Sequence, residues 1–180
     1  MKTDRSAATR EPEAVRRTVL LALGSNIEPE RHILAALDAL DEVLGIEALS
    51  AIYEADPVGS PGTPRFLNAA LRLTTGRSPR ALKFDVIRPL ERRLGRRRTS
   101  DPNAPRTIDI DIAAVEGLIV DRHDLRLPDP EILTRAYLAL PLADVAPGFR
   151  HPIEGLTLGE IAARFGDEPG VRRRADVRWP

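Results

Sequence analysis

Residues 105–112 are Pro105-Arg106-Thr107-Ile108-Asp109-Ile110-Asp111-Ile112, and from Ile108 onward apolar and acidic residues alternate strictly. Successive side chains of a β-strand point to opposite faces, so this alternation predicts a half-buried strand. We expect the isoleucines to enter a core and the two aspartates to lie side by side on the other face.

The two carboxylates allow two interpretations. Like charges at this spacing repel each other, so an ordinary solvated strand face would mix acidic, basic and neutral side chains. Two carboxylates on a rigid strand instead suit a hard divalent cation, above all Mg²⁺ shared with substrate phosphates. The alternative is a surface strand that happens to carry two aspartates, since acidic residues are common on surfaces. The spacing of the two aspartates does not by itself distinguish a metal site from a surface strand.

Composition narrows the class of protein. The 180 residues suffice for one domain with a sizeable core, and the zero net charge gives no general attraction to nucleic acid or membranes. The absence of cysteine excludes disulfides, thiolate zinc sites and a cysteine nucleophile. All but two of the 27 basic residues are arginine, so any phosphate must be bound by guanidinium groups. With no apolar run near the roughly 18 residues of a membrane span and no signal-like N-terminus, we expect a cytoplasmic protein. A monomer is the expected state, although none of these sequence features bears on it.

Periodicity and capping residues predict interleaved strands and helices. We expect strands at 18–23, 48–54, 66–74, 108–115 and 118–120, and helices at 29–44, 78–94, 131–134 and 156–165. Pro89 lies inside the second helix and predicts a kink. These elements predict an α+β fold, with helices packed on a mainly antiparallel sheet. The expected organisation is a disordered tail at 1–17, a domain at 18–166, and a C-terminal tail at 167–180 whose arginines at 172–174 are loosely held.

Arginines cluster just before the acidic strand. Arg96, Arg97 and Arg98 lie in the loop that leads into it, and Arg106 lies at its start. A solvated loop or a nucleic-acid patch is the plain interpretation of such a run. Beside two carboxylates these cations fit a polyphosphate better, because Mg²⁺ bridges phosphate oxygens and arginine forks neutralise the rest. The chain lacks the Gly-rich motifs of P-loop, Rossmann and protein-kinase sites.

An aromatic ring and an amide share one strand face. Phe66 and Asn68 are two residues apart in the strand expected at 66–74, so their side chains point the same way. Together they offer the stacking surface and the donor–acceptor edge that a flat heterocycle needs. Arg135 and Tyr137 offer a second cation and a second ring. For each of these residues, packing in the core or on the surface is the alternative.

These motifs, taken in order over roughly residues 18–148, resemble one known family. They are Leu23-Gly24-Ser25-Asn26, Tyr53 with Asp56-Pro57-Val58-Gly59, Phe66-Leu67-Asn68-Ala69-Ala70, Glu91, Leu94-Gly95-Arg96, Pro105-Arg106-Thr107-Ile108-Asp109-Ile110-Asp111, and Arg135 through Pro141-Leu142. The set resembles the 6-hydroxymethyl-7,8-dihydropterin pyrophosphokinase family of folate biosynthesis. Its most specific piece is the block at 105–111.

The resemblance implies a ferredoxin-like fold with three α-β-α layers, and transfer of the intact diphosphate from ATP to the pterin hydroxymethyl group with release of AMP. It implies a catalytic set of Arg96, Arg106, Asp109 and Asp111, with two Mg²⁺ ions bound by the two aspartates. The implied ATP-binding residues are Glu91, Arg96, Arg98, Arg106, Ile112, Asp129 and Arg135. The implied pterin-binding residues are Ala55, Asp56, Val58, Phe66, Asn68 and Tyr137, with the two rings enclosing the pterin.

Three departures from the family pattern affect the nucleotide side. Members often carry Arg-Trp-Gly where this chain has Pro102-Asn103-Ala104, so the loop lacks an arginine and a stacking ring. Asp129 replaces a frequent histidine, and an ionised carboxylate cannot donate a hydrogen bond to phosphate. Arg88-Pro89 replaces a commoner polar pair. We therefore expect a working but divergent enzyme with no nucleic-acid or membrane partner. The alternative is a catalytically impaired ferredoxin-like module that binds pterin or nucleotide.

Overall fold

The computed structural model describes residues 15–57, 62, 64–99, 101 and 104–179, so the expectations for 1–14, for Val58 and for 102–103 lie outside the described residues. The elements are β1 (Arg17–Ser25), α1 (Pro29–Leu44), β2 (Ala48–Leu49), β3 (Tyr53–Ala55), β4 (Phe66–Thr75), α2 (Pro79–Ala81), η1 (Leu82–Ile87), α3 (Arg88–Arg93), β5 (Asp109–Val115), β6 (Val120–Arg122), β7 (Leu125–Leu127), η2 (Pro130–Leu133), α4 (Ala136–Val145), α5 (Leu158–Ala163) and β8 (Val171–Arg173). Here η1 is a π-helix and η2 a 3-10 helix. Among these elements, every helix falls short of the length and apolarity needed to traverse a bilayer.

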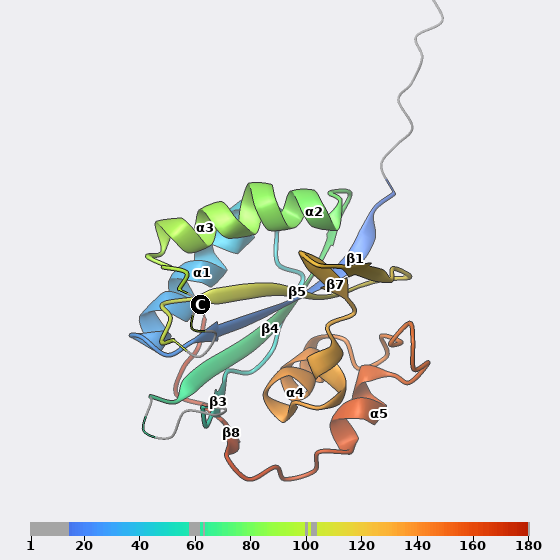
Figure 1. Cartoon of the computed structure of the whole chain (residues 1–180). Helices are drawn as coiled ribbons and strands as arrows, with labels where there is room; N and C mark the ends of the chain where they lie inside the picture. The colour runs from blue at the N-terminus through green and yellow to red at the C-terminus, as the bar shows by residue number, and fades with distance from the viewer. Residues whose placement is uncertain (1–14, 58–61, 63, 100, 102–103, 180) are drawn as a thin grey trace, which may run out of the picture.

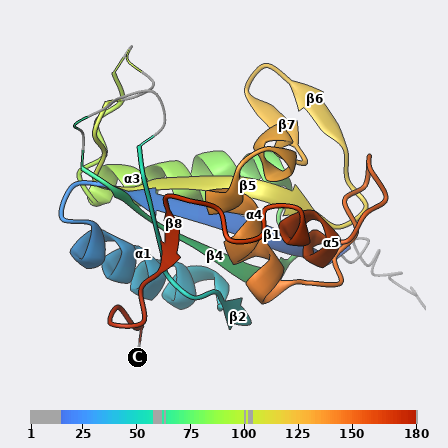
Figure 2. The ribbon, with the colours of Figure 1, turned by 90° about the horizontal axis from the view of Figure 1, so that it is seen from below.

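One antiparallel sheet organises the fold (Figure 1). Its strands lie in the order β5-β1-β4-β3-β8, with β2 also paired to β4, and β6 and β7 form a separate hairpin. Helices α1 and α3 cover one face of the sheet, and α4 and α5 cover the other, as the turned view also shows (Figure 2). The predicted α+β fold with three α-β-α layers is confirmed.

The alternation in β5 assigns its side chains to the two faces. Ile110 and Ile112 are buried in the apolar layer beneath α1 and α3, whereas Ala113 packs in the layer beneath α4 and α5. Each fully buried isoleucine contributes about 1.5–3 kcal/mol to stability. A shift of one residue in the pairing register of β5 would move every side chain to the opposite face of the sheet. The burial of the isoleucines therefore fixes Asp109 and Asp111 on the α4 side.

Most expected elements exist, with different limits. β1 begins at Arg17, one residue inside the expected tail, and the hairpin strand expected at 118–120 is β6 followed by β7. Ser78 caps its helix by accepting the Ala81 N–H at 3.2 Å. The single strand expected at 48–54 is broken into β2 and β3. At the break, the Ser50 hydroxyl accepts the Ala70 N–H at 2.9 Å and so replaces a backbone acceptor.

Pro89 lies next to a π-helical segment. Proline lacks an N–H and its ring clashes with the carbonyl four residues earlier, which an α-helix cannot accommodate without change. The chain widens into η1 just before Pro89, and the Arg88 N–H bonds to the Lys83 carbonyl five residues back. The disturbance predicted as a kink therefore takes the form of a π-helix, a feature that often lies beside functional sites.

Residues 171–173 form the edge strand β8 of the sheet, so the prediction that the arginines at 172–174 are loosely held is wrong. β8 pairs with β3, and the Glu54 carboxylate of β3 forms ion pairs with Arg65, Arg172 and Arg174 at 2.6–3.0 Å. Glu54 and Arg172 are 118 positions apart in the chain. An arginine run without apolar periodicity gave no sign of a partner so distant in sequence.

We predict that Glu54→Gln lowers the free energy of unfolding by about 1–3 kcal/mol, because it removes charge-assisted hydrogen bonds from a side chain only 10% exposed. Urea denaturation at neutral pH measures this. Glu47→Gln is the matched control, since the 43% exposed Glu47 lies 3.6 Å from Arg72, and its cost should stay within about 0.5 kcal/mol. Equal costs for the two variants would contradict the role assigned to Glu54.

Candidate active site

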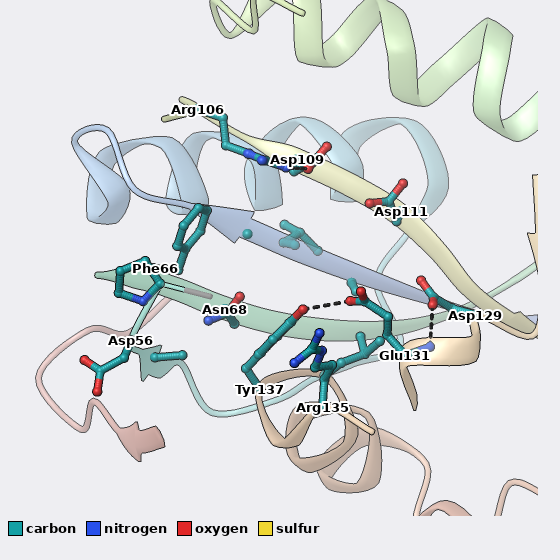
Figure 3. Close-up of a pocket in the computed structure, with 16 residues that line it drawn as sticks. Asp56, Phe66, Asn68, Arg106, Asp109, Asp111, Asp129, Glu131, Arg135 and Tyr137 are labelled. Carbon is teal, nitrogen blue, oxygen red and sulfur yellow. Dashed lines mark hydrogen bonds and ion pairs between the residues drawn. The ribbon is translucent and has the colours of Figure 1, made fainter. Parts of the chain in front are cut away.

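A cavity of about 410 Å³ opens on the α4 side of the sheet, within the size range of small-molecule sites (Figure 3). Strands β1, β4 and β5 supply one side of it, and the segment from η2 to α4 supplies the other. Its polar and aromatic lining consists of Asp56, Phe66, Asn68, Arg106, Asp109, Asp111, Asp129, Glu131, Arg135 and Tyr137, and Ala55 and Pro57 also line it. The structure thus brings together residues that the sequence analysis selected from separate segments.

Asp109 and Asp111 face this cavity as neighbours on β5. Burial at the concave surface raises the pKa of Asp111 to about 7, and the charges of Asp109, Glu91 and Asp129 add to the effect. Water still reaches the Asp111 carboxylate, so the crowding of chain atoms and like charges around it, and not full enclosure, is the physical cause. A positive charge next to the Asp111 carboxylate would therefore be favourable.

A divalent cation fits this donor set. Within the described part of the chain, no three acidic or histidine side chains converge as a complete metal cage. Mg²⁺ is commonly held by one or two carboxylates, with the remaining ligands from water and substrate phosphates. A lone pair of aspartates is therefore the arrangement expected for a metal that arrives with a phosphate ligand.

Arg106 is held rigidly beside the aspartates. Its guanidinium pairs with the Asp109 carboxylate and lies 5.7 Å from the centre of the Phe66 ring. Asn26 Oδ1 accepts the Arg106 N–H at 2.7 Å, and the N–H groups of Asn26 and Ile27 donate to the Arg106 carbonyl at 3.1 and 3.2 Å. The turn after β1 therefore positions Arg106.

Glu91 connects the basic loop to the acidic strand. It is 1% exposed, and its carboxylate accepts the Ile110 N–H at 3.0 Å and an Arg98 N–H at 2.8 Å. The Glu91 carbonyl also accepts the Arg96 N–H at 2.9 Å, and the Arg96 guanidinium lies 3.6 Å from the Asp109 carboxylate. Glu91, Arg96 and Arg98 lie outside the lining of the large cavity. Glu91 thus positions the arginines that the sequence analysis expected on the nucleotide side.

The other end of the cavity carries the rings. Phe66 and Asn68 project from β4, and Tyr137 projects from the start of α4 on the opposite side (Figure 3). The buried Asn68 Nδ2 has no hydrogen-bond partner among the described residues, so it can donate to a ligand. The Tyr137 hydroxyl donates to Glu131 Oε2 at 2.7 Å, and burial together with Glu131 raises the pKa of Tyr137. This end can receive a flat polar heterocycle.

A second cavity of about 150 Å³ adjoins the acidic strand. Ile112 and Lys83 line it, and Asp111 and Asp129 line both cavities. Asp129 Oδ1 accepts the Glu131 N–H at 2.8 Å, and burial raises the pKa of Asp129. Asp111 and Asp129 therefore lie between the two cavities, an arrangement that suits a transfer between two bound substrates.

Sequence reasoning assigned no role to three contributors to the site. Glu131 and Lys83 line the cavities, and Asn26 holds Arg106. A proline-flanked acidic residue, one lysine on a helix and an amide in a turn each have a common structural explanation, so only their spatial neighbours show the role.

Comparison with known proteins decides the family. The family model of 7,8-dihydro-6-hydroxymethylpterin-pyrophosphokinase (HPPK) matches residues 20–147. The chain belongs to the HPPK family. The 2-amino-4-hydroxy-6-hydroxymethyldihydropteridine pyrophosphokinases of Pseudomonas aeruginosa and Methylorubrum extorquens are each 38% identical to it, over 86% and 85% of this chain and 95% and 96% of theirs.

A solved structure supports the HPPK fold. Wild-type HPPK-DHPS from Plasmodium falciparum superposes with a TM-score of 0.68 at 14% identity, over 91% of this chain and 49% of that one. The chain therefore spans about half the length of this solved structure. The predicted ferredoxin-like α+β architecture is confirmed.

We predict that Asn26→Ala lowers kcat roughly tenfold, because the Arg106 N–H loses its acceptor and the guanidinium loses its fixed position. Steady-state kinetics of AMP formation measure this. Asn26→Asp keeps an acceptor oxygen in the same place and should retain more activity. An equal loss in both variants would show that the acceptor is not what matters.

We predict that Asp111→Asn raises the melting temperature of the metal-free protein at about pH 8 by a few degrees. The folded-state pKa of about 7 exceeds the ordinary value of 3.8, so stability supplied by protonated Asp111 is present at low pH and is lost as pH rises through 7. The gain should therefore vanish near pH 4. Thermal unfolding in EDTA tests this, with Asp121→Asn, 80% exposed on β6, as control. A gain independent of pH would contradict the assignment.

Proposed function

We propose that this HPPK chain transfers the diphosphate of ATP to 6-hydroxymethyl-7,8-dihydropterin in a Mg²⁺-dependent reaction of folate biosynthesis. The pterin hydroxyl oxygen bonds to the β-phosphorus and loses its proton, the bond from that phosphorus to the oxygen of the α-phosphate breaks, and AMP leaves. The observation that carries this proposal is the pair Asp109 and Asp111 on one strand: both line the ring-bearing cavity, and Asp111 also lines the second cavity.

Asp109 and Asp111 would hold the metal, and two ions are expected. Bound Mg²⁺ would neutralise triphosphate oxygens and support charge that develops on them. The raised pKa of Asp111 and the absence of a third ligand group among the described residues both support a cation that is completed by the nucleotide.

The arginines would bind phosphate oxygens. Arg106 lies between the Phe66 ring and Asp109, so its guanidinium is placed where the pterin hydroxymethyl group and the transferred phosphates would meet. Arg96 and Arg98 approach from the loop anchored by Glu91. Since no protein nucleophile is needed, positioning of the two substrates supplies much of the rate.

The ring-lined end would bind the pterin. Phe66 and Tyr137 would enclose its two faces, Asn68 Nδ2 would donate to its edge, and backbone groups of Ala55 and Asp56 would complete the contact. The proposed contribution of Val58 rests on the family resemblance.

Residues near the second cavity would bind the nucleotide. Ile112 lines that cavity, which supports its proposed place near the adenine, and Asp129 lines both cavities. Arg135 lines the large cavity, so it would contact phosphate from the α4 side. We propose a monomer as the working unit, and the use of ATP supports the predicted cytoplasmic location.

The test is AMP release from ATP with and without the pterin, in Mg²⁺ and after EDTA. Wild type should form AMP only with pterin and Mg²⁺, and Asp111→Ala should lose at least about a hundredfold in rate. Asp121→Ala, altered on the exposed hairpin, should match wild type. AMP formation that survives EDTA would remove the metal from the proposal. Pterin binding by wild type without any AMP would favour the impaired binding module.

A further inference from the structure

The rim of the large cavity is joined to a segment outside the family match, which ends at residue 147. The Asp56 N–H donates to the Gly170 carbonyl at 3.0 Å, directly before β8. Asp56 also lines the cavity at its ring-bearing end (Figure 3). The backbone at the cavity rim therefore rests on the C-terminal segment.

Gly170 permits an unusually close approach to Asp56. A Cβ placed on Gly170 would lie 2.8 Å from Asp56 Oδ2, closer than a real Cβ contact allows. The backbone φ of Gly170 is +90°, a conformation that other L-residues adopt at a cost. The other Asp56 oxygen accepts from Arg65 Nε at 2.8 Å, so a methyl group at position 170 would push the carboxylate out of this half-exposed ion pair. Glycine at 170 thus leaves the Asp56 carboxylate the room it needs in its present place.

β8 is held in place by strand pairing and by side-chain contacts, so it can position the neighbouring strand β3. Val171 pairs with Ala55 and Arg173 with Tyr53, so β8 covers the full length of β3. Arg174 bridges Glu54 at 2.9 Å and Glu30 of α1 at 2.8 Å. Further along, Trp179 Nε1 donates to Asp38 of α1 at 2.8 Å, which ties the segment's end to the body of the domain.

We propose that Gly170 and β8 form a positioning element for the pterin substrate. They hold the backbone of Ala55 and Asp56 at the spacing that the heterocycle edge needs, so that this part of the site is formed before the pterin arrives. Gly170 touches no substrate and acts through Asp56. The inference rests on the proposed placement of the pterin between Phe66 and Tyr137.

The test is Gly170→Ala in the full chain, with KM for each substrate and kcat measured separately. The added methyl displaces Asp56, so KM for the pterin should rise roughly tenfold while kcat and KM for ATP stay within about twofold. Gly166→Ala is the matched control, because Gly166 also has a positive φ, +54°, with no atom within 4 Å of a built Cβ. A similar rise in Gly166→Ala, or an equal rise in both KM values, would overturn the proposal.

Two more variants make the result decisive. In an Asp56→Ala background, Gly170→Ala should have no further effect on the pterin KM, because the carboxylate that the methyl group displaces is gone.

Arg172→Ala, at a 64% exposed side chain, loosens β8 without touching Gly170 and should raise the pterin KM about threefold. If Gly170→Ala does not fold, Arg172→Ala decides alone, and an unchanged pterin KM would refute the positioning role.

Phe66→Ala separates this inference from the proposed function. A raised pterin KM in Phe66→Ala, with none in Gly170→Ala or Arg172→Ala, would leave the function intact and refute the role of β8. An unchanged pterin KM in Phe66→Ala would show that the pterin is bound elsewhere, and the placement on which both depend would be wrong.

Discussion

Repulsion between the carboxylates of Asp109 and Asp111 is the constraint on which the site depends. Two isoleucines buried on the opposite face of β5 prevent the strand from turning these charges outward. The surrounding chain then opposes the repulsion locally, with Arg96 and Arg106 beside Asp109. No comparable cation is paired with Asp111 among the described contacts, and burial together with the neighbouring negative charges raises the pKa of Asp111. The apolar core thus maintains a charge arrangement that the free protein would not otherwise favour.

Different parts of the two cavities carry the groups that stack on a ligand and the groups that carry charge. The ring-lined end offers stacking surfaces and an unpaired amide, the acidic strand lies between the cavities, and arginines reach it from the loop after α3 and from the turn that precedes β5. Buried neighbours hold two of the arginines: Glu91 accepts from Arg98, and Asn26 accepts from the Arg106 N–H. An enzyme without a covalent intermediate needs this kind of rigidity, because its rate depends on alignment.

The sequence correctly predicted the elements that depend on residues close together in the chain. The alternation in β5 follows from periodicity, and the helices expected at 29–44 and from residue 78 follow from periodicity and capping residues; the structure confirms these elements. The errors lie where distant contacts decide. Ser50 divides a predicted strand through a bond to β4, and β8 owes its place to Glu54, 118 positions away. Likewise, the cavity residues that motifs identified have a chemistry that is unusual for a surface. The roles of Glu131 and Asn26 depend on residues that are distant in sequence or not linked to them by a motif, namely Tyr137 for Glu131 and Arg106 for Asn26.

The pairing of β3 with β8 also bears on the order in which the chain acquires its structure. The hydrogen-bonded pair Tyr53 and Arg173 is separated by 120 positions, so a large loop must close before this contact forms. The centre of the sheet, β1 with β4 and β5, can assemble while β3 is still an uncovered edge. During synthesis, that edge stays open to non-native pairing until residues beyond 170 emerge from the ribosome. The side of the cavity next to β3 is therefore the last to mature.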